Sequence, residues 1–116
     1  MMYSNIGIDL VKISRFQGYS IEDPFLLKIF TKNELEYSFK KKVHENTLSG
    51  KFAAKEAVIK ILNNFTHLPY SMKSIEILNN KNGSPYLNKC PVEGYTSSIS
   101  LSISHDGDYA IAIALL

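Results

Sequence analysis

The C-terminal part of the chain alternates between small polar and large apolar residues, which is the pattern of β-strands. Over residues 97–104, serines at the even positions alternate with Ile99, Leu101 and Ile103. After residues 105–108 the alternation resumes, with large side chains at 109, 111, 113 and 115 and alanines between them. The two runs predict an antiparallel hairpin with one bulky face and one small-residue face. A helix can lie close to the small face, and in so short a chain another copy could help to cover the bulky one.

The middle of the chain repeats its apolar residues at the helical period. This pattern predicts a helix over Thr47–Asn63, in which Ala53 and Ala57 allow a neighbouring backbone to come close. We expect this helix to cover the small face of the hairpin. A second helix over Lys32–Lys41 is predicted by the capping box Thr31-Lys-Asn-Glu34 at its start.

Shorter patterns complete the expected fold. The Asn82-Gly83 pair is a strong hairpin turn signal between two short strands. The remaining predicted elements are strands over Ile6–Val11, Ser74–Leu78 and Pro85–Leu87, and helical turns over Ile13–Phe16 and Pro24–Ile29. Together these patterns predict the α+β class, with a long central helix packed on a small antiparallel sheet.

Composition narrows the class of protein. The 116 residues suit one domain, residues 1–116, and leave little material for a deep pocket, so a large ligand would need walls from a second subunit. The single cysteine excludes an internal disulfide, which agrees with a reducing compartment. No apolar run of 18 residues and no signal peptide pattern is present, so we expect a cytoplasmic protein without a membrane role. The net charge of +2 does not indicate a nucleic-acid binder.

Two carboxylates stand out against apolar surroundings. Asp9 interrupts the first strand, and Glu56 lies near the expected buried face of the central helix. A carboxylate in such a place costs free energy unless it is paired, hydrogen-bonded or on a metal. Both also have ordinary explanations, since Asp9 could cap the following turn and Glu56 could pair with Lys60 on the helix surface. His105, at the expected hairpin turn, could likewise be only a surface residue.

Asp9 and Glu56 nevertheless form a chemically sensible pair. Mg²⁺ takes one or two carboxylates and completes its shell with waters and substrate phosphates. Lys51, Lys55 and Lys60 lie on the same helix as Glu56 and could offset phosphate charge. The motifs of zinc sites, serine hydrolases and Gly-rich phosphate loops are absent from the sequence. The residues therefore indicate a Mg²⁺-dependent phosphate or diphosphate site.

Four segments of the chain resemble, in order, the motifs of the holo-acyl-carrier-protein synthases, the short single-domain class of 4′-phosphopantetheinyl transferases. Together they extend over nearly the whole chain, and Phe-Ala-Ala-Lys-Glu-Ala with a downstream Ser-x-Ser-His is a specific combination. The segments are Ile6-Gly-Ile-Asp-Leu-Val-Lys-Ile-Ser-Arg-Phe16, Gly50-Lys-Phe-Ala-Ala-Lys-Glu-Ala-Val-Ile-Lys60, Asn82-Gly-Ser-Pro-Tyr-Leu87, and Ile99-Ser-Leu-Ser-Ile-Ser-His105 followed by Tyr109-Ala-Ile-Ala112.

The resemblance implies a role for each matching residue. Asp9 and Glu56 match the Mg²⁺ ligands, and Lys60 matches a lysine near the diphosphate of coenzyme A; these three are the expected catalytic residues. Arg15 and Phe25 match the surface that binds the acidic recognition helix of the carrier protein. The other expected contacts to coenzyme A are Lys51, Lys55, Gly83, Pro85, Ser104 and His105.

Two positions depart from the family pattern. Lys51 stands where the family usually has arginine, so it supplies a charge without a bidentate fork. Asp106 replaces the usual threonine or serine, and an acidic group there is unfavourable beside a phosphate. The general base is left open between Glu56, a water on the metal and His105.

The resemblance implies transfer of 4′-phosphopantetheine from coenzyme A to a serine of apo-acyl carrier protein, in support of fatty acid biosynthesis. It further implies the transferase fold and a homotrimer with its active sites at the subunit junctions. Two other functions are kept as alternatives. One is a catalytically inactive module that binds coenzyme A or a nucleotide, and the other is a small nucleic-acid-binding domain that uses Lys40–Lys42.

Overall fold

The computed structural model describes residues 5–66 and 69–116, and its helices and strands place the chain in the expected α+β class. Residues 1–4, on which the expectation about a signal peptide partly rests, lie outside this range. The elements in chain order are β1 (Ile6–Lys12), η1 (Ile13–Phe16), α1 (Pro24–Ile29), α2 (Lys32–Phe39), α3 (His44–Leu62), η2 (Met72–Ser74), β2 (Glu76–Asn79), β3 (Pro85–Lys89), β4 (Ser100–Asp106) and β5 (Tyr109–Leu115).

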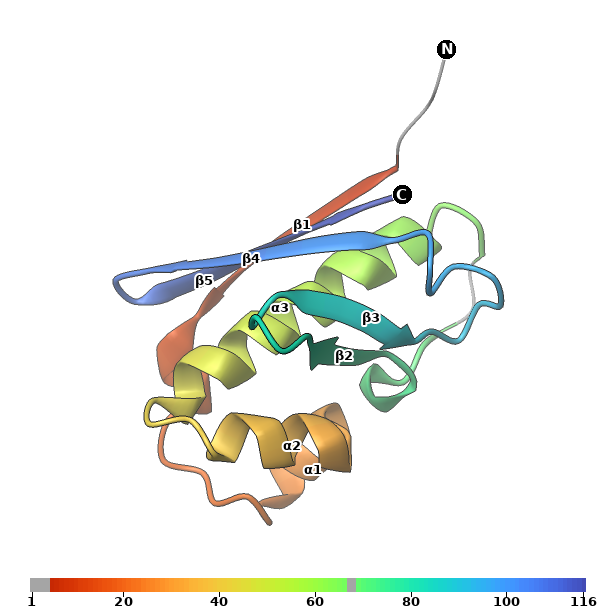
Figure 1. The fold of residues 1–116 in the computed structure, drawn as a ribbon. Helices are drawn as coiled ribbons and strands as arrows, with labels where there is room; N and C mark the ends of the chain where they lie inside the picture. Colours follow the sequence, from red (N-terminus) through yellow and green to blue (C-terminus); the bar gives the residue numbers. More distant parts are fainter. Residues whose placement is uncertain (1–4, 67–68) are drawn as a thin grey trace.

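The long helix α3 is the centre of the arrangement (Figure 1). On one side it packs against a three-stranded antiparallel sheet of order β1-β5-β4. On its other side lie the two-stranded β2–β3 hairpin and the helices α1 and α2 (Figure 1). The prediction of a central helix on a small antiparallel sheet is therefore confirmed. None of the helices in the described ranges is long and apolar enough to cross a membrane.

The hairpin of β4 and β5 forms as predicted, but the expected distribution of its side chains is wrong. The alanines of β5 do face α3 and are buried, as expected. Ile103 of β4, however, pairs with Ala112, and Ser102 pairs with Ile113. Cross-strand partners share a face of the sheet, so each face combines large residues from one strand with small residues from the other. The face of the hairpin that packs on the helix therefore carries large residues of β4 and small residues of β5.

The helix comes closest to the sheet at Gly7 of β1. A Cβ atom built on Gly7 would lie only 1.9 Å from the carbonyl oxygen of Ala57 in α3. Gly7 pairs with Ala114 in the neighbouring strand, so three small residues surround the contact. The absence of a side chain at position 7 is what allows the backbones of strand and helix to touch.

Several element boundaries differ from the predicted ones. Helix α3 begins at His44 rather than Thr47, and the His44 ring in its first turn stacks on Phe39 with 4.3 Å between the ring centroids. No side-chain cap marks this start, so the sequence carried no signal for it. Strand β4 runs from Ser100 to Asp106, which places His105 on the strand and not in the turn.

A buried ion pair connects α2 to α3. The Lys55 side chain is 0% exposed, and its ammonium lies 2.6 Å from Oε1 of Glu34. The same ammonium donates to the backbone carbonyls of Ile29, Met72 and Ile75 at 2.8–2.9 Å. The predicted capping box is present, and Oε2 of Glu34 also accepts the amide of Ile77 at 2.7 Å.

The expectation that Lys55 contacts coenzyme A is not supported by this geometry. All donors of its ammonium are directed at protein oxygens, and no part of the side chain reaches solvent. Burial lowers the pKa of Lys55, and the adjacent Glu34 carboxylate opposes that shift. Its role in the fold is to connect α1, α2, η2 and β2 to the central helix.

Substitution Gly7→Ala is expected to destabilise the fold strongly, because the new methyl group meets a backbone carbonyl that cannot move aside. Overpacking of this kind costs about 1–3 kcal/mol or more. Gly50→Ala is the matched control, since its Cβ would meet only the side chains of Ile103 and His105, at 2.9–3.0 Å. Urea unfolding should give the larger loss for Gly7→Ala, and equal losses would contradict the assigned contact.

Substitution Glu34→Gln removes the counter-charge of the buried Lys55 ammonium. We expect a loss of about 3–5 kcal/mol in the free energy of unfolding, as for other buried pairs that lose one partner. Lys32→Gln, which breaks the exposed Lys32–Glu36 pair, is the control and should cost under about 0.5 kcal/mol.

Candidate functional site

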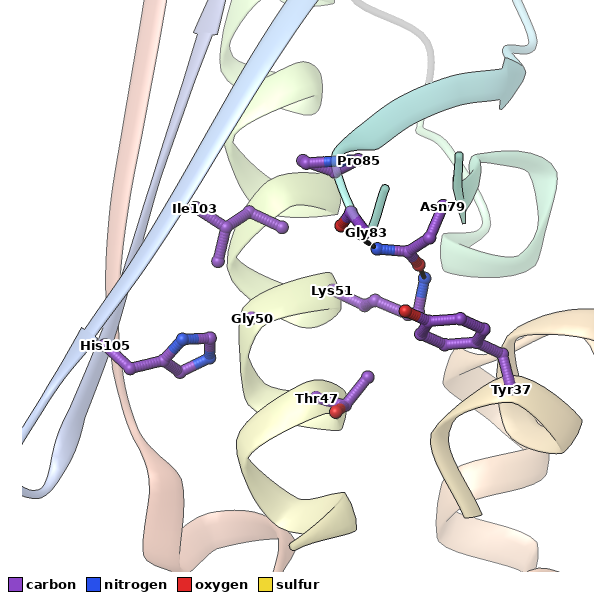
Figure 2. Close-up of a pocket in the computed structure, with 9 residues that line it drawn as sticks. All are labelled: Tyr37, Thr47, Gly50, Lys51, Asn79, Gly83, Pro85, Ile103 and His105. Carbon is purple, nitrogen blue, oxygen red and sulfur yellow. Dashed lines mark hydrogen bonds between the residues drawn. The ribbon is translucent and has the colours of Figure 1, made fainter. Parts of the chain in front are cut away.

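A cavity of about 220 Å³ opens between α2, α3, β4 and the β2–β3 turn. Figure 2 shows side chains from these four parts of the chain pointing into one space. Four of the residues expected to contact coenzyme A, namely Lys51, Gly83, Pro85 and His105, line it. The lining residues are Tyr37, Thr47, Gly50, Lys51, Asn79, Gly83, Pro85, Ile103 and His105.

His105 reaches this cavity because it lies on the inner side of β4. Side chains alternate along a strand, so His105 shares the face of Ile103 rather than that of Ser104. Its ring lies against Gly50, where a Cβ would come within 3.0 Å of Nε2. Nε2 is 2.7 Å from the carbonyl oxygen of Asn46, which can only accept, so this nitrogen carries the proton. The histidine is thus held in a fixed orientation with Nδ1 left for another partner.

Lys51 forms part of the cavity wall, although its side chain is buried. Its ammonium donates to the carbonyl of Ile77 and to Oδ1 of Asn79, each at 2.6 Å. It also lies 4.8 Å from the ring centroid of Tyr37. Burial lowers the pKa of Lys51 to about 8, against the opposing charge of Glu34.

The β2–β3 turn supplies the opposite wall of the cavity (Figure 2). Gly83 has a φ of +92°, a conformation that favours glycine, and the predicted turn at Asn82-Gly83 is confirmed. The side-chain amide of Asn79 donates to the Gly83 carbonyl at 2.9 Å. Pro85 begins β3 directly opposite Asn79.

A separate charged cluster forms where β1 crosses α3. The ammonium of Lys60 lies 2.6 Å from the carbonyl oxygen of Ile8 and 3.4 Å from Oδ1 of Asp9. Burial raises the pKa of Glu56, and the negative charge of Asp9 raises it further, while Lys60 and Arg15 oppose the shift. The structure therefore brings Asp9, Glu56 and Lys60 together, with Arg15 close enough to act on Glu56.

The donor set of this cluster fits Mg²⁺. Two carboxylates that repel each other across a partly buried site gain from a divalent cation between them. Within residues 5–66 and 69–116 there is no group of three or more His, Cys, Asp or Glu side chains of the kind that forms an all-protein metal cage. A cation held by Asp9 and Glu56 would therefore keep positions open for water and phosphate oxygens.

The cavity and the charged cluster lie on different sides of α3. An α-helix turns by about 100° per residue, so Thr47 and Glu56 point in nearly opposite directions. Ser104 lies on the opposite face of β4 from Ile103 and lines another hollow of about 220 Å³, to which Leu10, Tyr109 and His105 also contribute. One copy of the chain thus presents the expected metal ligands on one side and most of the expected coenzyme contacts on another.

Arg15 and Phe25 share one surface near the charged cluster. Phe25 stacks on Phe16 and on Tyr19, with ring centroids 6.0 and 4.9 Å apart, and remains 36% exposed. The Arg15 guanidinium lies 5.0 Å from the ring centroid of Phe52. This surface offers a fixed cation beside an exposed aromatic ring.

The sequence reasoning missed Tyr37, Thr47 and Asn79, which line the cavity, and Asn46, which holds His105. Tyr37 and Thr47 carry no motif, so only the packing of α2 against α3 reveals them. Asn79 precedes a predicted turn, where asparagine is expected for local reasons alone. The alternation over residues 97–104, continued by one residue, would have placed His105 on the face of Ile103, and the pairing of that face with the alanines of β5 makes it the inner one.

Comparisons with known proteins identify the family. Residues 5–114 match the model of the 4′-phosphopantetheinyl transferase superfamily. Curated relatives named holo-[acyl-carrier-protein] synthase include one from Caldicellulosiruptor bescii, 40% identical over 98% of both chains, and one from Thermodesulfovibrio yellowstonii, 37% identical over 99% of both.

Solved structures agree with this match. The ACPS–CoA complex of Chronobacterium ammoniagenes has a TM-score of 0.79 and 28% identity, with 98% of this chain and 96% of that chain covered. The holo-(acyl-carrier-protein) synthase of Bacillus anthracis, in complex with CoA (3′,5′-ADP), has a TM-score of 0.75 and 31% identity, with 96% and 93% covered. The resemblance seen in the sequence is confirmed: the chain belongs to the 4′-phosphopantetheinyl transferase superfamily.

Proposed function

We propose that this chain, as one transferase domain over residues 1–116, transfers 4′-phosphopantetheine from coenzyme A to a serine of an apo-acyl carrier protein. The observation that carries the proposal is the grouping of Asp9, Glu56 and Lys60 where β1 crosses α3. Relatives that match over nearly their whole length are named holo-[acyl-carrier-protein] synthase. A module that only bound coenzyme A would have no need of the paired carboxylates.

In the proposed reaction, the serine hydroxyl attacks the β-phosphorus of coenzyme A. The new bond joins the serine oxygen to phosphorus, and the diphosphate bridge breaks to release adenosine 3′,5′-bisphosphate. Asp9 and Glu56 would hold Mg²⁺, which when bound neutralises the diphosphate and orients it for in-line attack. The Lys60 ammonium would stabilise the charge that grows on the leaving phosphate.

The serine must lose its proton during the attack, and Glu56 is the better placed base of this chain. Its carboxylate lies in the charged cluster, beside Asp9 and Lys60. His105 lies on another side of α3, and its Nε2 is directed at the Asn46 carbonyl. We propose that the Glu56 carboxylate accepts the proton of the attacking serine.

Arg15 and Phe25 are proposed to bind the carrier protein. An exposed ring beside a guanidinium suits an acidic helix that has apolar residues between its carboxylates.

Fatty acid biosynthesis is the proposed pathway. A cytoplasmic location stays a prediction, in agreement with the single cysteine of the chain.

A homotrimer with shared active sites is the proposed assembly. The outer face of β1 exposes Ile6, Ile8 and Leu10, next to the exposed Ile113 and Leu115 of β5. A contiguous apolar strip of this kind favours contact with another protein surface. The metal ligands and the cavity face different ways on one subunit, so a coenzyme that touched both would lie between two copies.

The function is tested by incubating the protein with coenzyme A, Mg²⁺ and an apo carrier protein and weighing the carrier. The wild-type protein should add the mass of phosphopantetheine. Glu56→Gln should lower the rate by about 10²–10³-fold, as expected when several kcal/mol of metal-assisted stabilisation are lost. Its melting temperature without metal should be unchanged or higher, because the repulsion between Asp9 and Glu56 disappears.

Lys89→Gln, an exposed change at the end of β3, serves as the control and should load the carrier at the wild-type rate. A wild-type protein that loads no carrier, while a known transferase loads the same one, would overturn the proposed function. A Glu56→Gln variant with full activity would remove the metal-ligand assignment and leave the transferase proposal standing.

Substitution Ile8→Lys tests the assembly. Ile8 is 50% exposed in the single chain and would be buried between copies in the trimer. Light scattering should show a trimer for the wild-type protein and smaller species for Ile8→Lys, with transfer activity reduced at least about tenfold. Leu27→Lys, at a residue 44% exposed on α1, across α3 from the sheet, should remain trimeric. An active monomeric Ile8→Lys variant would contradict the shared site.

A further inference from the structure

The β2–β3 turn forms a wall of the cavity but has little packing to support it. Residues 80–84 are all exposed. The turn is closed by backbone hydrogen bonds from Asn80 to Ser84 and from Gly83 to Asn80, each at 2.9 Å, and by side-chain hydrogen bonds among Asn80, Asn82 and Ser84. A two-stranded hairpin is marginally stable on its own. The position of this wall must therefore depend on contacts to the rest of the molecule.

A hydrogen-bonded relay connects the turn to the central helix. The ammonium of Lys51 donates to the Ile77 carbonyl in β2 and to Oδ1 of Asn79, each at 2.6 Å. The other end of the Asn79 amide, Nδ2, donates to the Gly83 carbonyl at 2.9 Å. Figure 2 shows Lys51, Asn79 and Gly83 in this order between the helix and the turn.

The lysine determines which way the Asn79 amide points. An ammonium has only donors, so Oδ1 must face Lys51 and Nδ2 must face the Gly83 carbonyl. Without the ammonium the amide could rotate and place Oδ1 against that carbonyl, which would be repulsive. One buried cation thereby fixes a hydrogen bond in an exposed turn.

We propose that Lys51 is a positioning residue for the coenzyme pocket, which orients the Asn79 amide and so holds the Gly83 carbonyl and the wall at Pro85 in place. This rests on the proposed function for the identity of the ligand. It replaces the expectation that Lys51 contacts a phosphate directly. Two of the three donors of its ammonium are occupied, the side chain is buried, and the Tyr37 ring lies 4.8 Å away.

The test is a double-mutant cycle on the KM for coenzyme A, with Lys51→Met, Asn79→Ala and the pair combined. Each single variant should raise KM about tenfold and leave kcat within about twofold, the effect of one oriented hydrogen bond lost. The double variant should be no worse than either single one, because both break the same relay. Additive effects, or an Asn79→Ala variant with wild-type KM, would overturn the proposal.

Coenzyme A without its 3′-phosphate separates positioning from a direct contact to that group. A misplaced wall weakens both substrates, so Lys51→Met should raise the KM of each by the same factor. A loss confined to the coenzyme that carries the 3′-phosphate would assign Lys51 as a phosphate ligand and overturn the positioning role.

Asn79→Asp gives a second test at a half-buried position whose substitution does not disturb the core. It keeps an oxygen for Lys51 but directs another oxygen at the Gly83 carbonyl, so its KM should rise at least as much as that of Asn79→Ala. The amide resonances of Gly83 and Ser84 should shift in both variants and in Lys51→Met. Lys89→Met, which removes a charge from the far end of β3, is the control and should leave these resonances and KM unchanged.

Failure of the relay and failure of the proposed function give different results. If the wild-type protein loads no carrier, the function fails, while the amide shifts still report on the relay. If the wild-type protein is active and the amides of Gly83 and Ser84 do not respond to Lys51→Met, the relay is wrong and the function stands.

Discussion

The candidate site depends on the contact between the backbones of β1 and α3 at Gly7 and Ala57. A Cβ on Gly7 would overlap the Ala57 carbonyl, so strand and helix pack against each other with no side chain between them. Asp9 follows Gly7 on the same face of the strand, and Glu56 precedes Ala57 on the helix. The two carboxylates are neighbours because the small residues beside them are packed. The free energy of this packing offsets the burial of Glu56 and its repulsion by Asp9, which together raise the pKa of Glu56.

Helix α3 carries three lysines that the sequence alone does not distinguish, and the structure buries two of them and exposes the third. Lys55 has its charge neutralised in the core by Glu34, and Lys51 donates to oxygens of the β2–β3 hairpin. Lys60 alone of the three is exposed and lies beside Asp9. These roles follow from the direction in which each side chain leaves the helix. Helix α3 therefore stabilises the fold and also separates the two parts of the candidate site. The proposed trimer would reunite those parts.

Alternation and periodicity were sufficient to predict the strands, the hairpin and the central helix. They did not predict which large residues share a face with the alanines, because that depends on the pairing of Ile103 with Ala112 across two strands. The motifs located Asp9 and Glu56, which local packing brings together. The role of Lys55 could not be predicted, since its partners Glu34 and Ile75 come from distant segments. The Thr31–Glu34 capping box was visible in the sequence, but nothing there indicated that Glu34 would also bind a buried ammonium.

The adjacency of Lys55 and Glu56 has a consequence for motion in the site. One of these side chains is anchored in the core and the next belongs to the charged cluster, so α3 cannot rotate or slide without breaking a buried ion pair. Any adjustment of the protein to a ligand must therefore come from parts outside the helix. Such an adjustment would exchange hydrogen bonds of the exposed β2–β3 turn and of the Lys60 side chain, and it would leave the buried pair intact. Induced fit in this molecule would move the β2–β3 turn and the Lys60 side chain while helix α3 stays in place.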